Sequence, residues 1–216
     1  RVLFRSLQHA VEYCCSYGFD DIIVNVHYLA DMVEEEIRRL NAKKFRISVS
    51  DERELLLENG GGLYKARHFF DKNPFLVYNA DIVTDLDLSL LLDLHLEKKA
   101  LATLAVRERP GSRFLLTDKN GVLRGWRNVS TGEEILKTDS DEGLKAIGFS
   151  SVQIIDPEIF SYMRDGIYTV VDLYLELAAT GRILTRRFDE GYWFNVGTPE
   201  NLENVREFFK SSRTAW

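Results

Sequence analysis

The alternation of helical and strand patterns over the first half of the chain restricts its fold more than any other feature. Apolar residues at helical spacing between Leu7 and Cys15 are followed by a strand-like run, DIIVNV, at 21–26. Further helical patterns occupy 29–40, 62–70 and 88–99, and they alternate with strand patterns at 45–50, 75–80 and 101–106. This order is typical of βαβ units, so we predict an α/β fold with a mixed, mostly parallel sheet and helices on both faces.

The pattern changes after residue 106. Residues 113–128 predict a hairpin with its turn at Lys119-Asn120-Gly121, and a long strand follows at 146–155. Helical patterns at 156–163, 169–181 and 198–210 surround two short strand patterns, ILTRRF and YWFNV. We expect a single domain over 1–216, in which 107–145 is an insertion that lies over the sheet.

Composition narrows the classes of partner. The chain has 216 residues, 45% of them hydrophobic, and a formal net charge of −6, which argues against nucleic acid as a partner. The only cysteines are the adjacent pair Cys14 and Cys15, a usage that favours a reducing, cytoplasmic setting. No apolar run approaches the roughly 18 residues of a membrane span, so we expect no membrane partner. Composition leaves the oligomeric state unknown.

Three successive glycines, Gly60, Gly61 and Gly62, follow Glu58 and Asn59 just before a helical pattern. Each glycine costs roughly 0.5–1 kcal/mol inside a regular element, so bare backbone must be needed there. One interpretation is that a flat ring approaches the main chain and is read by backbone N–H groups. A flexible turn at a helix start is the other. The segment lacks both the Gly-Lys-Ser/Thr of a P-loop and GxGxxG spacing.

Two polar residues stand where predicted strands end. Asp81 follows the strand pattern FLVYNA, and the strand predicted within YWFNV ends at Asn195. Open α/β sheets bind ligands beyond the carboxyl ends of their strands, where a carboxylate can hold a divalent cation among phosphate oxygens. Asp81 could equally be an ordinary turn aspartate. Asp87 is more simply an N-cap, and Thr198 is explained as one.

Four segments in order, LLLENGGG, NAD, GFSSV and WFNVGTPENL, resemble the sugar-1-phosphate nucleotidyltransferases of the GT-A-like, Rossmann-like nucleotidyltransferase fold. The chain is similar in particular to mannose-1-phosphate guanylyltransferase-like and N-acetylmuramate-1-phosphate uridylyltransferase-like members, over nearly its whole length. The resemblance implies that a nucleoside triphosphate, GTP or UTP, reacts with a sugar 1-phosphate to give an NDP-sugar and pyrophosphate. It also implies Mg²⁺ as the cofactor.

The resemblance assigns roles to individual residues. It makes Asp81 the catalytic, metal-binding aspartate, and it places Asn195 where the family usually has a second metal-binding aspartate. An amide offers an oxygen but no charge, so this departure weakens the metal site. The implied nucleotide-binding residues are Glu58, Gly60, Gly61, Gly62 and Asn79. The implied sugar-phosphate-binding residues are Arg109, Arg113, Gly148, Ser150 and Asp172, although the two arginines also fit a solvated loop and Asp172 also fits a solvent-facing helix position.

The front of the chain departs further from the family. Members open with a strand, a glycine-rich loop carrying an arginine, and a Lys-Pro segment, whereas this chain opens with RVLFRS and a helical pattern. We therefore expect 1–6 to be foreign, the first strand and phosphate loop to be missing, and the fragment to be inactive. A non-catalytic nucleotide-sugar-binding regulatory subunit on the same fold is the alternative. A dinucleotide-dependent oxidoreductase lacks its glycine fingerprint here.

Overall fold

The computed structural model describes the backbone of residues 2–211. Its helices are α1 (Val2–Ser16), α2 (Ala30–Asn41), α3 (Glu58–Lys65), α4 (Leu88–Lys98), α5 (Val170–Leu177) and α6 (Pro199–Ser211), with short 3-10 helices η1 (Ala66–Phe69), η2 (Pro157–Ser161) and η3 (Ala178–Thr180). Its strands are β1 (Asp21–Val26), β2 (Arg46–Asp51), β3 (Phe75–Tyr78), β4 (Ile82–Thr84), β5 (Ala102–Arg107), β6 (Arg113–Thr117), β7 (Leu123–Asn128), β8 (Glu133–Leu136), β9 (Lys145–Ile155), β10 (Ile183–Arg187) and β11 (Trp193–Asn195). The predicted alternation of the first half is confirmed.

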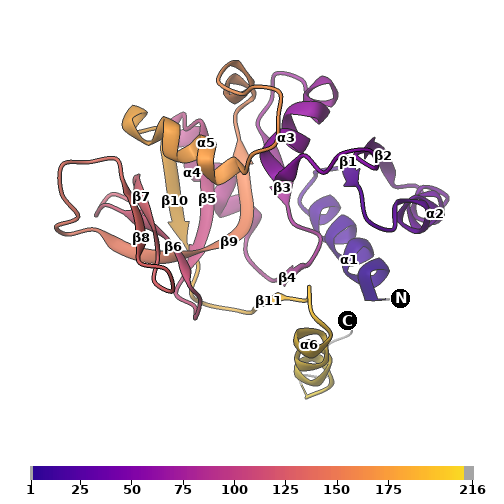
Figure 1. Cartoon of the computed structure of the whole chain (residues 1–216). Coiled ribbons are helices and arrows are strands. Elements are labelled where there is room, and N and C mark those ends of the chain that lie inside the picture. Colours follow the sequence, from indigo (N-terminus) through magenta and orange to yellow (C-terminus); the bar gives the residue numbers. More distant parts are fainter. Residues whose placement is uncertain (1, 212–216) are drawn as a thin grey trace.

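The main sheet is built around the long strand β9. Strands β3 and β5 both pair antiparallel with β9, and β10 pairs parallel with β5, so β3, β5 and β10 run in one direction. A separate parallel pair, β1–β2, lies at the α1–α2 side of the molecule, and β4 pairs antiparallel with β11 (Figure 1). The fold is a mixed α/β fold, as predicted.

Helices cover both faces of this sheet. Successive β5 residues point to opposite sides, so they pack against different helices. Leu104 and Val106 are buried with Leu173 of α5, whereas the intervening Ala105 is buried with Leu91 of α4. The predicted hydrophobic run at 101–106 is thus explained by burial on both faces.

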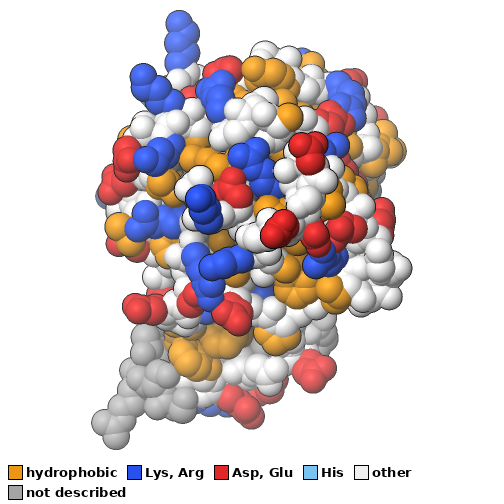
Figure 2. Space-filling model, turned by 90° about the vertical axis from the view of Figure 1, so that its left-hand side faces the viewer, with side chains coloured by type: hydrophobic (Ala, Val, Ile, Leu, Met, Phe, Trp, Pro, Cys, Tyr) orange, Lys and Arg blue, Asp and Glu red, His pale blue; other side chains and the backbone are white. Residues whose placement is uncertain are grey.

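The segment 107–145 differs from the expectation of an insertion lying over the sheet. Its strands continue the sheet itself, in the order β10-β5-β9-β6-β7-β8. The predicted hairpin is confirmed, and its turn reaches back to β10, where Thr185 donates its N–H to the carbonyl oxygen of Gly121 at 2.7 Å. The segment therefore extends and curls the sheet. Lys, Arg, Asp and Glu side chains are interspersed on this side of the molecule (Figure 2).

Capping residues set several helix ends. Asp87 accepts a hydrogen bond from the N–H of Ser89 at 2.9 Å, which confirms its predicted role as the N-cap of α4. Thr169 and Asp172 form a capping box at the start of α5. Thr198 accepts from the N–H of Asn201 at 3.2 Å and caps α6, as predicted. Residues 2–6, which were expected to be foreign, form the beginning of α1. Arg1 lies outside the described residues.

Two strands keep an unpaired edge. Within the described part of the chain, β1 pairs only with β2 and β3 only with β9. Residues of both strands line a cavity of about 850 Å³, together with Leu7, Val11 and Cys14 of α1. The cavity extends to the carboxyl end of β3, where the candidate site begins. None of the described helices has the length and apolarity needed to cross a bilayer.

Candidate functional site

Asp81 and Asn195 meet at the edge formed by β4 and β11. Asn195 is opposite Ile82 in the antiparallel pair, and the N–H of Val196 donates to the carbonyl oxygen of Asp81 at 2.7 Å. The Asn195 amide Nδ2 donates to Asp81 Oδ2 at 2.8 Å, and Asn195 Oδ1 accepts from the N–H of Gly197 at 2.9 Å. The prediction that both residues face one edge is confirmed.

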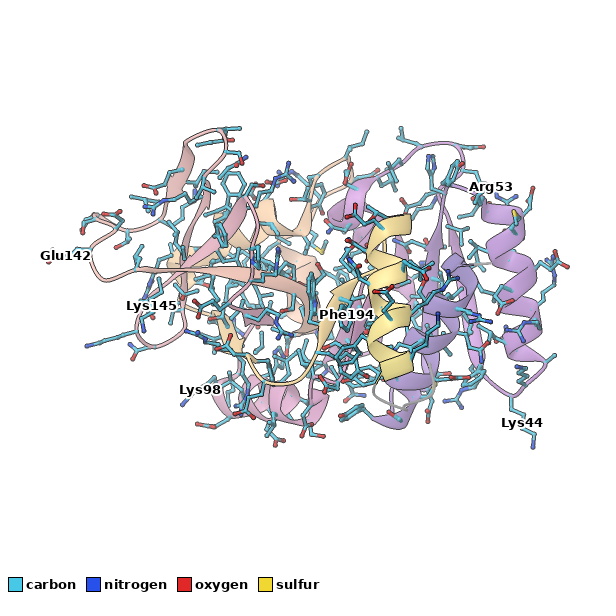
Figure 3. All side chains as sticks on the ribbon, turned by 90° about the horizontal axis from the view of Figure 1, so that it is seen from below. Lys44, Arg53, Lys98, Glu142, Lys145 and Phe194 are labelled. Carbon is cyan, nitrogen blue, oxygen red and sulfur yellow. The ribbon has the colours of Figure 1, made fainter. Side chains whose placement is uncertain are left out.

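Helix α6 lies directly beyond this edge. Seen from below, α6 crosses the molecule between its β6–β8 side and its α1–α2 side, with Phe194 beside it (Figure 3). Val205 of this helix is buried together with Val83 and Val196. The packing of α6 thus fixes β11 against β4 and, with it, the position of Asn195.

An irregularity in β9 brings further polar groups to the site. The β5–β9 register shifts between Leu104 and Val106, and Ser151 has a φ of 59°. The Ser151 carbonyl accepts from the N–H of Asn79 at 3.2 Å, and the Ser150 carbonyl accepts from Trp193 Nε1 at 2.9 Å. The irregular strand therefore anchors the residues two positions before Asp81 and Asn195.

The glycine triplet was predicted to form a turn before a helix. In the structure it is part of α3, which begins at Glu58 with a φ of 58°. The N–H groups of Gly60 and Gly61 both donate to the carbonyl oxygen of Tyr168, at 3.0 and 3.3 Å. These two groups are therefore occupied within the chain, and the expectation that they face a ligand is wrong.

Close packing explains why no side chain is present at these positions. A Cβ atom on Gly61 would lie 2.0 Å from the carbonyl oxygen of Gly166, and one on Gly62 would lie 2.4 Å from both Asn25 Nδ2 and Glu52 Oε1. Such separations are far below van der Waals contact. The bare backbone is needed for the fit of α3 against neighbouring segments.

Glu52 is a candidate that sequence reasoning missed. It follows the end of β2 and is only 4% exposed. Its Oε2 accepts from the N–H of Leu57 at 3.2 Å, while its Oε1 finds no hydrogen-bond partner among the described residues. Its position just past a strand of a parallel pair, where ligand groups gather, was the available signal.

The cavity gathers some predicted residues and leaves others apart. Glu58, Asn79 and Asp81 line it, and so do Asn25, Glu52 and Asn59. The three glycines and the predicted sugar-phosphate residues are not among its lining residues. Glu58 and Asn79 of the nucleotide prediction therefore share one hollow with the predicted metal ligand Asp81. The glycines, Asn195 and the predicted sugar-phosphate residues do not line it.

Arg109 is the predicted sugar-phosphate residue with the most defined surroundings. Its Nη2 donates to the carbonyl oxygen of Phe149 at 3.2 Å, and its guanidinium lies 5.2 Å from the Trp193 ring centre. A Cβ on Gly148 would lie 2.6 Å from Arg109 Cγ, so Gly148 makes room for this side chain. Burial lowers the pKa of Arg109. Its Nε has no partner in the described structure.

The other predicted sugar-phosphate residues differ in setting. Arg113 is exposed at the start of β6. Ser150 is 1% exposed, and within the described region its hydroxyl has no hydrogen-bond partner. Asp172 is exposed, and its carboxylate accepts from both the N–H and the hydroxyl of Thr169, at 3.0 and 2.8 Å. This capping role engages the carboxylate that was expected to face the sugar.

The donor set at the Asp81 edge fits a single divalent cation. A Cβ on Gly197 would lie 3.0 Å from Asn195 Oδ1 and 3.2 Å from Asp81 Oδ2, so its absence leaves open a small cradle beside two oxygens. No group of three or more His, Cys, Asp or Glu side chains suited to an ion occurs among the described residues. A divalent ion at this edge would therefore need further oxygen ligands besides the one carboxylate, as Mg²⁺ commonly does.

These features define a Rossmann-like nucleotidyltransferase fold with a polar edge at its strand ends, and the comparisons agree. The family model described as nucleotidyl transferase matches residues 3–116. An N-acetylmuramate alpha-1-phosphate uridylyltransferase of Caulobacter vibrioides is 31% identical over 90% of this chain and 79% of its own length. A UTP–glucose-1-phosphate uridylyltransferase of Synechocystis is 29% identical over 93% of this chain and 54% of its own length.

The crystal structure of HddC from Yersinia pseudotuberculosis has the same fold, with a TM-score of 0.72, 20% identity and coverage of 96% of this chain and 84% of that one. The present chain spans most of the Caulobacter relative and about half of the Synechocystis one. The chain belongs to the nucleotidyl transferase family, within the sugar-1-phosphate nucleotidyltransferases.

Proposed function

We propose that this protein transfers a nucleotidyl group from a nucleoside triphosphate to a sugar 1-phosphate, releasing pyrophosphate. The observation that carries the proposal is the cavity in which Glu58, Asn79 and Asp81 meet beside the Asp81–Asn195 pair. In this reaction a phosphate oxygen of the sugar 1-phosphate attacks the α-phosphorus in line, and the α–β phosphoanhydride bond breaks. No protein nucleophile is needed, so the residues contribute by positioning the two phosphates.

Asp81 would hold Mg²⁺ together with phosphate oxygens, and the bound ion would neutralise charge that develops on the triphosphate. Asn79, anchored by Ser151, shapes the wall of the cavity next to this carboxylate. Arg109, Arg113, Gly148 and Ser150 are proposed to lie along the sugar phosphate. The partly buried Arg109 supports this proposal best, because burial from water strengthens its attraction for an anion.

We propose that the nucleotide is UTP or GTP, because the chemistry of Glu52 favours uracil or guanine as the base. Glu52 lines the cavity, and its Oε1 is buried beside Gly62 without a partner in the described structure. An ionised carboxylate can only accept hydrogen bonds. Uracil and guanine each carry a ring N–H that could donate to it, whereas cytosine and adenine present a lone pair at the corresponding ring nitrogen. The free Cys14 and Cys15 support action in the reducing cytoplasm.

Pyrophosphate release from UTP or GTP, measured against a panel of sugar 1-phosphates, tests the proposal. Release should depend on a divalent cation and on Asp81, and Asp81→Ala should abolish it. Asp93→Ala is the matched control, because Asp93 is exposed on α4 and does not line the cavity. Equal turnover in both variants would refute the assignment of Asp81.

A non-catalytic regulatory subunit is the second candidate, favoured by the amide at Asn195 where the family usually has a carboxylate. The same panel, repeated as binding measurements by calorimetry, separates the two. Binding of nucleotide sugars without pyrophosphate release for any pair of substrates would support the regulatory subunit.

A further inference from the structure

We infer that Asn195 is a positioning residue that holds Asp81 in place without a cation, and that this edge takes its divalent ion bound to the nucleotide and not as a free ion. The second half rests on the proposed function. The first half rests only on the contacts of Asp81, Asn195 and Gly197.

The direction of the Asn195 amide follows from its neighbours. The N–H of Gly197 can only donate, so the atom facing it at 2.9 Å has to be the oxygen Oδ1. The Nδ2 group then faces Asp81 Oδ2 at 2.8 Å. Asn195 therefore presents a hydrogen-bond donor to the carboxylate that is expected to carry the ion.

The backbone holds the two side chains together whether or not an ion is present. The β4–β11 ladder pairs Asn195 with Ile82, and Val196 donates its N–H to the Asp81 carbonyl. A second carboxylate at 195 would lie at hydrogen-bond distance from the first, and the two like charges would repel unless a cation lay between them. The amide removes this repulsion, so the edge forms in the absence of metal.

An amide in place of a carboxylate at position 195 also changes how a divalent ion can bind at this edge. With one carboxylate at the edge, a divalent ion keeps one unit of positive charge after pairing with Asp81. The neutral Asn195 oxygen adds little attraction for a free hydrated ion. Triphosphate oxygens supply the missing negative charge, which is why the ion is expected to arrive with the nucleotide. The retained positive charge would then be available to attract the anionic substrates.

Binding of Mn²⁺ alone, followed by electron paramagnetic resonance, tests the inference without any turnover. Wild type should bind free Mn²⁺ weakly, and Asn195→Asp should bind it at least tenfold more tightly. In metal-free buffer the melting temperature of Asn195→Asp should fall by roughly 3 °C or more, and Mn²⁺ should restore it, whereas wild type should be insensitive to Mn²⁺.

Asn73→Asp is a matched control. Asn73 Nδ2 donates to Asp71 Oδ2 at 2.9 Å in an exposed turn, so the variant creates the same pair of carboxylates where solvent screens them. It should change neither Mn²⁺ affinity nor melting temperature. A response of Asn73→Asp equal to that of Asn195→Asp would overturn the inference, as would wild type that binds free Mn²⁺ as tightly as Asn195→Asp.

The reciprocal exchange Asp81→Asn with Asn195→Asp decides the case in which Asn195→Asp alone fails to fold. The exchange restores one carboxylate and one amide, so it should recover the metal-free melting temperature. Failure to recover it would show that repulsion is not the cause and would overturn the inference. Mn²⁺ complexes of UTP and GTP are measured in parallel. Their failure to bind, with the free-Mn²⁺ contrast intact, would overturn the second half of the inference together with the proposed function and leave the positioning role of Asn195 standing.

Discussion

Asn59 Oδ1 accepts a hydrogen bond from the N–H of Val170 at 2.8 Å, which joins the glycine-containing helix α3 to the first turn of α5. Gly60 and Gly61 complete this junction by donating their N–H groups to Tyr168. The bare positions of α3 thus form a packing surface for residues 166–170, more than a hundred positions later in the chain.

Gly61→Ala should destabilise the protein, because the new Cβ would lie 2.0 Å from the backbone oxygen of Gly166 and neither segment can move freely. Overpacking of this kind typically costs about 1–3 kcal/mol. Gly111→Ala is the control, since its nearest neighbour is the flexible end of Arg109. Urea unfolding of both variants measures the difference, and equal midpoints would refute the packing role.

Tyr174→Phe should also destabilise the fold. The Tyr174 hydroxyl donates to Gln153 Oε1 at 2.9 Å, and both residues are buried, at 0% and 2% exposure. Removal of the hydroxyl leaves a buried amide oxygen unsatisfied, at a cost of about 1–3 kcal/mol. Tyr162→Phe, on the exposed surface, should cost much less. A small effect of Tyr174→Phe in urea unfolding would mean that Gln153 finds another donor.

The stability of the protein should fall as the pH drops below 6.5, and His95 should contribute. Burial lowers the pKa of His95, with a smaller opposing effect from Asp156, so the folded ring stays neutral where the unfolded ring takes up a proton. The free energy of unfolding then falls with falling pH, by at most about 1.4 kcal/mol per pH unit for one histidine. The loss of stability from His95 stops once the pH is below the pKa of His95 in the folded protein.

Thermal unfolding between pH 7 and pH 5 checks this prediction. His95→Gln should reduce the loss of stability on acidification, and the exposed His68→Gln should not. His9, whose pKa burial also lowers, should account for part of the remaining slope. An unchanged pH profile for His95→Gln would contradict the assignment.

The unpaired edges of β1 and β3 should promote self-association, because exposed strand edges pair with other chains. Ile23→Lys places a charge on β1 beside the cavity and should lower the aggregated fraction in light scattering. Leu96→Lys adds the same charge on the exposed face of α4 and should have little effect. Monodisperse wild-type protein at high concentration would rule out this role for the edges.

Several features were determined by the sequence alone, because their signals are local. The run DIIVNV is a strand with the predicted bounds, since a short apolar run between turn residues has few other solutions. Asp87 caps α4 because an aspartate before a helical pattern satisfies free N–H groups. Asp81 and Asn195 share one edge because Asp81 directly follows one predicted strand and Asn195 ends another.

The tertiary structure alone decided which contacts those residues make. The glycines of α3 face Gly166 and Tyr168, and the strands of 107–145 join β9, through pairings that no local pattern encodes. Asn195 points its amide at Asp81 only because the N–H of Gly197 holds the other end. Periodicity reports which face of an element is buried, but the partner on that face depends on how distant segments of the chain are brought together.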